Sequence, residues 1–214
     1  MKHKLWTKVT CLVCLLPTLL CGCNDVHKEP SQPISAIYDD FLCYDEQGLI
    51  DVADTIIVGT VTKTEIIYNK GDDQDGCLKK GTPMQYSHIK VTRTLQGSVP
   101  ENNKIVVPLS GDGKTYSVDN IMTVGGYFEK GDRVLLFLKS RSDEYWTSLK
   151  ENDPKFYRKI KKFKETLSGP CNLYQSTFWL DEEGNILHDR NKSNARLFTD
   201  CATVDELAEK YDLE

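Results

Sequence analysis

The sequence predicts a mainly β protein, a small closed sheet with helical additions. Several short segments are rich in β-branched residues and are bounded by glycine, proline and polar turns. One segment instead carries apolar residues at helical spacing, and helical patterns also stand near both ends of the domain. The chain has 214 residues, of which 39% are hydrophobic, enough for one packed core. We therefore expect a single domain at 34–214.

The first 22 residues have the layout of a secretory signal. Lys2, Lys4 and Lys8 give a positive start, and the uncharged run Val9–Leu20 follows. A membrane-spanning helix needs about 20 apolar residues, so this run is too short to be one. We exclude the segment from the fold.

A short motif ends this leader, Leu20-Cys21-Gly22-Cys23. It resembles the bacterial lipobox, in which a small residue precedes the lipidated cysteine. Gly22 fits that place, whereas lipidation of Cys21 would put the bulky Leu20 there. The resemblance implies cleavage after Gly22 and a diacylglyceryl thioether on Cys23. The other interpretation is an ordinary cleaved signal followed by an incidental cysteine.

The lipid on Cys23 would decide where the protein is located. Each buried methylene contributes about 0.8 kcal/mol, and two acyl chains are needed for stable attachment. The polar, proline-containing segment at 23–33 would form a flexible tether to the domain. We expect the protein on the outer face of the bacterial cytoplasmic membrane, or facing the periplasm. The net charge of −5 argues against nucleic acid as a partner.

The domain begins with a short helix expected within 34–52, and β-rich segments follow. We predict strands at 55–68, 86–95, 104–109 and 133–138, with 145–149 as a further partner strand. The polar stretch 69–83 is expected to be a hairpin tip. Pro108 lies near a strand end, where a missing N–H donor is tolerated.

An amphipathic helix is predicted at 153–168. Asp153 is its expected N-cap, Pro154 its first residue and Gly169-Pro170 its stop. The apolar positions follow each other at intervals of three and four residues: Phe156, Ile160, Phe163 and Leu167. This helix interrupts the series of strands, and we interpret it as an insertion.

The last part of the chain predicts a hairpin and a terminal helix. The hairpin turns at Glu183-Gly184-Asn185. Thr203 and Glu206 form a capping box for a helix over 204–211.

Four segments, "DVADTIIVGTV", "YSHIKVTRTLQG", "FEKGDRVLLFL" and "FWLDEEGNIL", carry a second resemblance. In order and spacing they resemble bacterial secreted proteins whose domain is like that of netrin modules and the tissue inhibitors of metalloproteinases. The similarity covers about 51–187 apart from the helical insertion. It implies a five-stranded barrel of the OB type. Those inhibitors grip the protease zinc with an N-terminal Cys-x-Cys, but here Cys21 would be removed and Cys23 lipidated, so that mechanism is not expected.

The mature domain has four further cysteines, Cys43, Cys77, Cys171 and Cys201. An even number in an exported chain predicts up to two disulfides with three possible connectivities. We favour Cys171 with Cys201 and Cys43 with Cys77. Because the four are scattered singly, they do not predict a metal site.

No motif predicts catalysis or a cofactor. "SGDGKTYS" at 110–117 lacks a phosphate loop's first glycine, where Pro108 stands instead, and in "GDDQDG" at 71–76 only Asp73 and Asp75 fit a calcium loop. His27, His88 and His188 have no nucleophile signature beside them. We expect a protein that is not an enzyme.

Six cations mark the predicted insertion: Lys155, Arg158, Lys159, Lys161, Lys162 and Lys164. They form either a solvated helix face or a surface that contacts anionic lipid or wall polymer. The sequence thus predicts a membrane-anchored extracytoplasmic lipoprotein that serves as a non-catalytic binding or envelope-interaction module for an unidentified protein partner. The alternative is a protease inhibitor that acts through surface loops.

Overall fold

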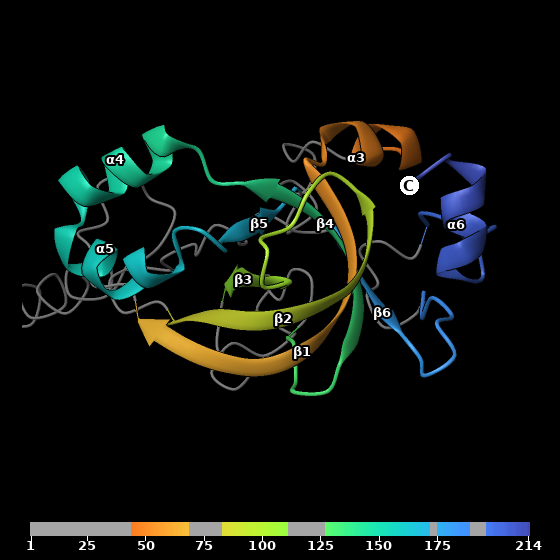
Figure 1. Ribbon diagram of the computed structural model, residues 1–214, viewed down its shortest axis with the longest axis horizontal. Helices are drawn as coiled ribbons and strands as arrows, with labels where there is room; N and C mark the ends of the chain where they lie inside the picture. Colours follow the sequence, from red (N-terminus) through yellow and green to blue (C-terminus); the bar gives the residue numbers. More distant parts are fainter. Residues whose placement is uncertain (1–43, 69–82, 111–126, 172–174, 189–195) are drawn as a thin grey trace, which may run out of the picture. The chain divides into compact units, whose positions relative to one another are not determined.

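Four strands rich in β-branched residues form most of an antiparallel sheet. They are β1 (Thr55–Tyr68), β2 (Pro83–Gln96), β3 (Lys104–Ser110) and β4 (Arg133–Ser140), as the sequence predicts (Figure 1). The computed structural model describes residues 44–68, 83–110, 127–171, 175–188 and 196–214. All of them belong to one compact unit, Leu42–Glu214.

Two short strands complete a six-stranded sheet. They are β5 (Ser168–Pro170) and β6 (Thr177–Leu180). The strand order is β3-β2-β1-β4-β5, with β6 also paired to β4. The mainly β class with helical additions is therefore confirmed.

The sheet bends through register shifts, and one backbone contact joins its two ends. Pairing between β1 and β2 shifts at three places, one of them between Val61 and Lys63, and such bulges increase local twist and bending. A single parallel bridge pairs Val106 of β3 with Leu167, and the Val106 N–H donates to the Thr166 carbonyl at 2.8 Å. Among the described residues, strand pairing does not otherwise close the sheet.

Alternating side chains of β1 supply two separate cores. Ile56 and Val58 point into a cluster that packs against α3 (Glu46–Val52) and α6 (Val204–Lys210). Ile57 and Val61 point into the cluster within the bent sheet, together with Trp179. Because both faces are covered, the first five residues of β1 are all buried.

Two helices, and not a strand followed by one helix, connect β4 to β5. The first, α4 (Asp143–Asn152), includes the segment 145–149, so the strand predicted there is wrong. Ser142 caps α4 by accepting a hydrogen bond from the Tyr145 N–H at 3.2 Å. The aromatic residues that suggested a strand face the next helix, and Trp146 is buried.

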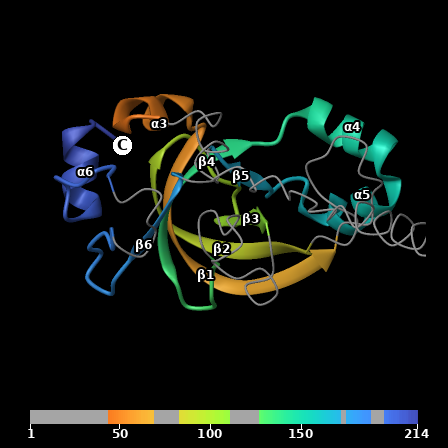
Figure 2. The same ribbon diagram turned by 180° about the vertical axis from the view of Figure 1, so that it is seen from behind.

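The predicted helix at 153–168 is shorter than expected. Asp153 caps it and Pro154 begins it, but α5 covers only Pro154–Ile160 and a 3₁₀ turn, η2 (Lys161–Phe163), follows. The chain unwinds there because Thr166 and Leu167 bond to β3 and Gly169 belongs to β5. In Figures 1 and 2, α4 and α5 lie at one end of the sheet and α3 and α6 at the other.

The C-terminal predictions hold with small changes. The Gly184 N–H bonds to the Asp181 carbonyl at 3.3 Å, which closes the expected turn. Thr203 caps α6 through the Glu206 N–H at 3.2 Å. The Glu206 carboxylate reaches back to the N–H of Ala202, one residue before the cap.

Candidate functional site

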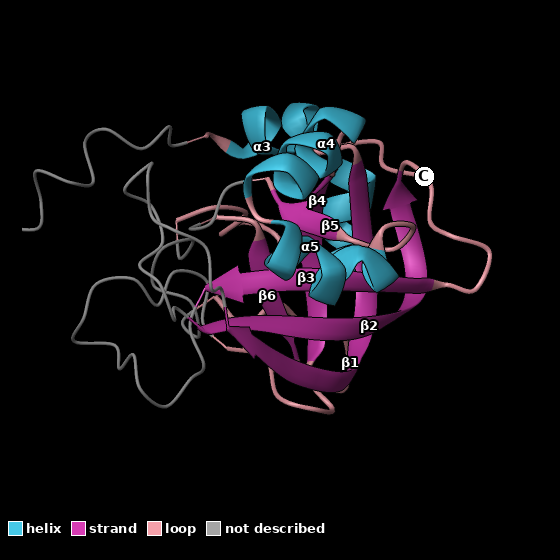
Figure 3. Ribbon diagram, turned by 90° about the vertical axis from the view of Figure 1, so that its left-hand side faces the viewer, coloured by secondary structure: helices cyan, strands magenta, loops and turns pink. Residues whose placement is uncertain are grey.

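The segment between β4 and β5 contains α4, α5 and η2, and we call it the insertion. It packs as a layer on the sheet. Its apolar face and the strands beneath it form a third core cluster: Tyr86, Val106, Trp146, Phe156, Ile160, Phe163 and Leu167. The rings of Tyr86 and Phe163 stack with centroids 5.5 Å apart. Seen from this end, α4 and α5 lie in front of the sheet (Figure 3). The insertion therefore holds its cations in fixed places relative to β1 and β2.

The structure divides the six predicted cations into two groups. Lys162 Nζ lies 2.9 Å from Glu65 Oε2, and Lys164 Nζ lies 3.3 Å from Asp143 Oδ1. Lys159 Nζ donates to the carbonyl of Tyr68 at 3.1 Å. Lys159 and Lys162 thus fasten the insertion to β1, and Lys164 joins its last segment to α4.

The other three cations face solvent. Lys155, Arg158 and Lys161 are exposed and form no ion pair within the described residues. The Arg158 Nε donates only to the Pro154 carbonyl of its own helix, at 3.2 Å. They are the part of the predicted cationic surface that is free to meet an anionic partner.

Glu65 is the centre of the fastening contacts. His88 Nε2 donates to Glu65 Oε1 at 2.8 Å, and Lys63 lies 3.5 Å from the same oxygen. The Glu65 side chain is only 21% exposed. Burial by itself would raise its pKa, but hydrogen bonds from His88 and Lys162 outweigh that effect and lower the pKa to about 2.

The His88–Glu65 pair has the residue types of a catalytic dyad, but the serine beside His88 in the chain does not reach it. The hydroxyl next to it in the chain, Ser87, lies on the opposite face of β2 and is fully buried. The His88 ring instead meets the edge of Phe163, with centroids 5.5 Å apart. The contacts of the pair among the described residues join β1, β2 and the insertion, and sequence reasoning missed them.

A pocket of about 230 Å³ lies at the other end of the sheet. Its lining includes Arg93 and Arg133 together with the acidic Glu183 and Asp205. The Arg93 guanidinium binds the carboxylates of Asp205 and Glu214, while Arg133 donates to the carbonyl of Asp181 at 2.8 Å and to that of Glu182. Both arginines tie the strands to the C-terminal segments, and the lining of the pocket carries charges of both signs.

The structure does not contain the predicted Cys171–Cys201 disulfide, and both thiols are free. They contact the same core cluster, yet Cys171 Sγ faces the Val52 carbonyl at 3.9 Å and Cys201 Sγ faces Asp200 at 3.6 Å. Burial raises the pKa of Cys171 to about 12 and, together with the Asp200 charge, that of Cys201 to about 11. Cys43 and Cys77 lie outside the described residues.

Several sequence predictions fall on parts of the chain that the structure does not describe. These are the lipobox with Cys23, the tether at 23–33, the acidic segment at 71–76 and most of the segment at 110–117. Within the described ranges, no group of three or more His, Cys, Asp or Glu side chains could hold a metal ion. No helix in the described part has the length and apolar character to cross a bilayer.

Comparison with known proteins adds no relative. No protein-family model matches the chain, and the search of curated proteins found no match.

Proposed function

We propose that this protein is a membrane-anchored extracytoplasmic lipoprotein. One observation carries the proposal: a charged start and an apolar run of 12 residues lead into Leu20-Cys21-Gly22-Cys23. Every described helix and strand begins after Asp45, so the leader, the acceptor cysteine and the tether all precede the folded domain.

We further propose that the domain is a non-catalytic binding or envelope-interaction module. Its support is the set of solvent-facing cations on the insertion, whereas the charged clusters around Glu65 and Arg93 make contacts within the fold: Glu65 joins β1 to β2 and the insertion, and Arg93 joins β2 to α6. Glu46 of α3 likewise contacts Lys210 and Tyr211 at the end of α6. The alternative of a loop-based protease inhibitor remains a prediction from the sequence.

The finer fold that we propose is a five-stranded barrel of the OB type. Its support is the strand order, which places β3 and β5 at the two ends of the sheet, and the parallel bridge between Val106 and Leu167. A close through-space NMR contact between the backbones of these two residues is expected. Its absence in solution would leave an open sheet.

Mass spectrometry of the protein from native membranes tests the anchor. The expected result is an N-terminal peptide that begins at Cys23 and carries a diacylglyceryl group. Cys23→Ser should abolish both the lipid and detergent-phase partitioning, while the matched control Cys21→Ser should retain both. A retained leader, or lipid on Cys21, would contradict the proposal.

A further inference from the structure

Strand β1 continues well beyond its pairing with β4. The two strands pair over Thr55–Thr60, and the next residue, Val61, bonds to the loop before β4: its N–H donates to the Asp132 carbonyl at 2.9 Å, and its carbonyl accepts from the Gly131 N–H at 2.8 Å. Over Lys63–Tyr68, β1 pairs with β2 on one side, and no other described strand pairs with it on the other. We call Lys63–Tyr68 the free edge. Figures 1 and 3 show this part of β1 at the lower border of the sheet.

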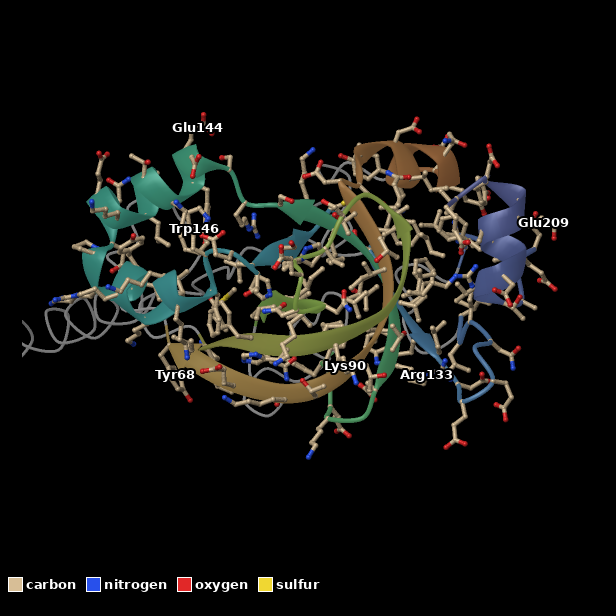
Figure 4. The ribbon with its side chains drawn as sticks, viewed as in Figure 1. Tyr68, Lys90, Arg133, Glu144, Trp146 and Glu209 are labelled. Atoms are coloured by element: carbon tan, nitrogen blue, oxygen red, sulfur yellow. The ribbon has the colours of Figure 1, made fainter. Side chains whose placement is uncertain are left out.

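The two faces of the free edge differ in their surroundings. Glu65 bonds to the insertion, and Ile67, two positions on, packs against the third core cluster. Ile66 and Tyr68 point to the opposite face, where they are 38% and 49% exposed. Figure 4 shows Tyr68 at the end of β1. The strand is therefore covered on one face and presents apolar side chains to solvent on the other.

Contacts with the insertion hold the free edge in place. Lys162 Nζ lies 2.9 Å from Glu65 Oε2, and Lys159 Nζ donates to the Tyr68 carbonyl at 3.1 Å. Across the hairpin, His88 Nε2 lies 2.8 Å from the other oxygen of Glu65. A strand that is fixed in advance loses little conformational entropy when another chain pairs with it.

The backbone of the free edge has polar groups without a strand partner among the described residues. In an antiparallel pair, every second residue directs its N–H and C=O away from the neighbouring strand. Such groups form a template for another extended chain, and natural edges are commonly blocked by lysine, proline or a bulge. A bulge between Val61 and Lys63 and the Lys63 side chain lie at the start of this edge. Because Thr64–Tyr68 contains no lysine, arginine or proline, the rest of the edge is open to pairing.

The side chains of the free edge define the segment that would fit it. Lys63 is 63% exposed and lies 3.5 Å from Glu65, whose carboxylate already has two other partners. An acidic residue opposite Lys63 would gain a cross-strand ion pair, and apolar residues opposite Ile66 and Tyr68 would cover them. Opposite residues of paired strands point to the same face, so the acidic and apolar residues of the added segment lie on opposite faces.

A second copy of this chain fits the edge less well than a separate segment. In an antiparallel pair related by a two-fold axis, one residue lies opposite its own equivalent. Pairing centred on Glu65 opposes two carboxylates, and pairing centred on Ile66 leaves Lys63 beyond the end of the opposite strand. In either case both insertions lie on one face of the joined sheet, where their exposed cations would repel each other. The observations therefore favour a different chain.

We infer that the free edge accepts an extended segment of a partner protein, which adds a strand beside β1. The segment carries two apolar residues two positions apart, opposite Ile66 and Tyr68, and an acidic residue three positions from the nearer of them, opposite Lys63. Main-chain hydrogen bonds supply the attachment, and the side chains on the two faces supply the selection. This inference rests on the proposed role as a binding module and names the class of partner.

Hydrogen exchange first tests whether the edge is open. The protein is residues 23–214 with Cys23→Ser, which contains the whole compact unit Leu42–Glu214. The backbone amides of Thr64–Ile67 should alternate between slow and fast exchange, because only every second one is bonded to β2. Slow exchange at all four amides would show that the edge is already covered, and this would overturn the inference.

Selection from a phage-displayed library of random nonapeptides tests the partner. The enriched peptides should share the spacing of two apolar residues and one acidic residue given above. In a synthetic peptide of the enriched sequence, N-methylation of every second amide should abolish binding in one of the two alternations and preserve it in the other. Equal loss in both alternations would contradict strand addition.

Side-chain variants test the two faces separately by fluorescence anisotropy with the labelled peptide. Lys63→Glu should weaken binding about fivefold, and exchange of the peptide's acidic residue for lysine should restore it. Ile66→Ser with Tyr68→Ser should weaken binding about tenfold. The matched control is Lys90→Glu, an exposed lysine of β2 opposite Thr60, which should change the affinity less than about twofold.

Three further results would overturn the inference. They are a library without enriched sequences, equal weakening by Lys63→Glu and Lys90→Glu, and a dimer in sedimentation velocity that Ile66→Ser with Tyr68→Ser dissociates. The last result would assign the edge to a second copy. Unfolding midpoints equal to that of the parent show that the variants differ in binding and not in folding. Mass spectrometry of Cys23 decides the anchor independently, so failure at the edge would not be confused with failure of the proposed function.

Discussion

Nε2 of His88 lies 2.8 Å from Oε1 of Glu65, across the paired strands β1 and β2. The other carboxylate oxygen of Glu65 accepts from Lys162 at 2.9 Å. One side chain therefore links both strands of the long hairpin to the helical insertion. Because a carboxylate only accepts hydrogen bonds, the proton of this contact is on the imidazole nitrogen.

Removing the charge of Glu65 should loosen this link. Glu65→Gln is expected to lower the free energy of unfolding at pH 7 by about 1–2 kcal/mol, a value discounted for solvent screening. The pKa of Glu65 falls from 4.5 to about 2 in the fold. Its ionised form therefore stabilises fully above pH 4.5, and this contribution is lost as the pH falls toward 2. Urea unfolding from pH 7 to pH 2.5 measures the difference.

The control for this prediction is Asp143→Asn. Asp143 is 91% exposed and pairs with Lys164 at 3.3 Å, so its removal should cost less than about 0.5 kcal/mol at any of these pH values. If Glu65→Gln behaved like this control, or if its effect persisted unchanged at pH 2.5, the Glu65 contacts would not stabilise the fold.

The strands could be predicted from the sequence because their β-branched residues favour a strand over a helix. Thr55–Tyr68 is rich in β-branched residues, and the structure gives the bounds that the pattern suggested. Helix α4 was missed because Tyr145, Trp146 and Leu149 also suit a strand, and tertiary packing against α5 decided the outcome. The end of α5 was misplaced because a bond from Val106 to Thr166 outweighs helical periodicity.

Only part of the predicted cationic surface could be inferred from the sequence. All six cations can be counted there, but their division depends on partners far away along the chain. Lys162 and Glu65 are 97 positions apart, and Lys159 and Tyr68 are 91 apart. The exposure of Ile66 and Tyr68 could not be predicted either, because the same strand begins with five buried residues.

The cap of α5 provides a local test of the insertion. Asp153 Oδ1 accepts from the Phe156 N–H at 2.9 Å, and Pro154 follows as the first helical residue. Asp153→Ala should lower the unfolding free energy by about 1 kcal/mol, whereas Asp153→Asn keeps an acceptor and should change it little. Chemical denaturation of the two variants checks this. Equal losses would show that charge, and not the cap hydrogen bond, is what matters.

Two glycines with positive φ should respond differently to the same substitution. Gly97 has φ +77°, and an added Cβ would lie 2.0 Å from the Asp54 carbonyl oxygen. Gly131 has φ +100°, but a Cβ there would have open space around it. Gly131→Ala should cost only the backbone strain, about 1–2 kcal/mol, while Gly97→Ala should cost clearly more because the backbone must also move.

Thermal unfolding of both variants measures this difference. The larger loss for Gly97→Ala follows from the position of Asp54 directly before β1, where its N–H bonds to the Leu138 carbonyl at 2.9 Å. A shift of this backbone would disturb the start of the central strand. Equal melting temperatures for the two variants would mean that the Gly97 turn is less tightly packed than the distance indicates.

The buried thiol of Cys201 and the partly buried thiol of Cys171 should remain reduced and unreactive in the folded protein. A pKa of about 12 for Cys171 and about 11 for Cys201 leaves almost no thiolate at pH 8, and only the thiolate reacts rapidly. Alkylation by iodoacetamide should therefore be roughly a hundredfold slower at these two positions in the native protein than in urea. Peptide mapping after timed alkylation measures both rates. A disulfide-linked peptide joining Cys171 and Cys201 would contradict the structure, since the two sulfur atoms face Val52 and Asp200 and not each other.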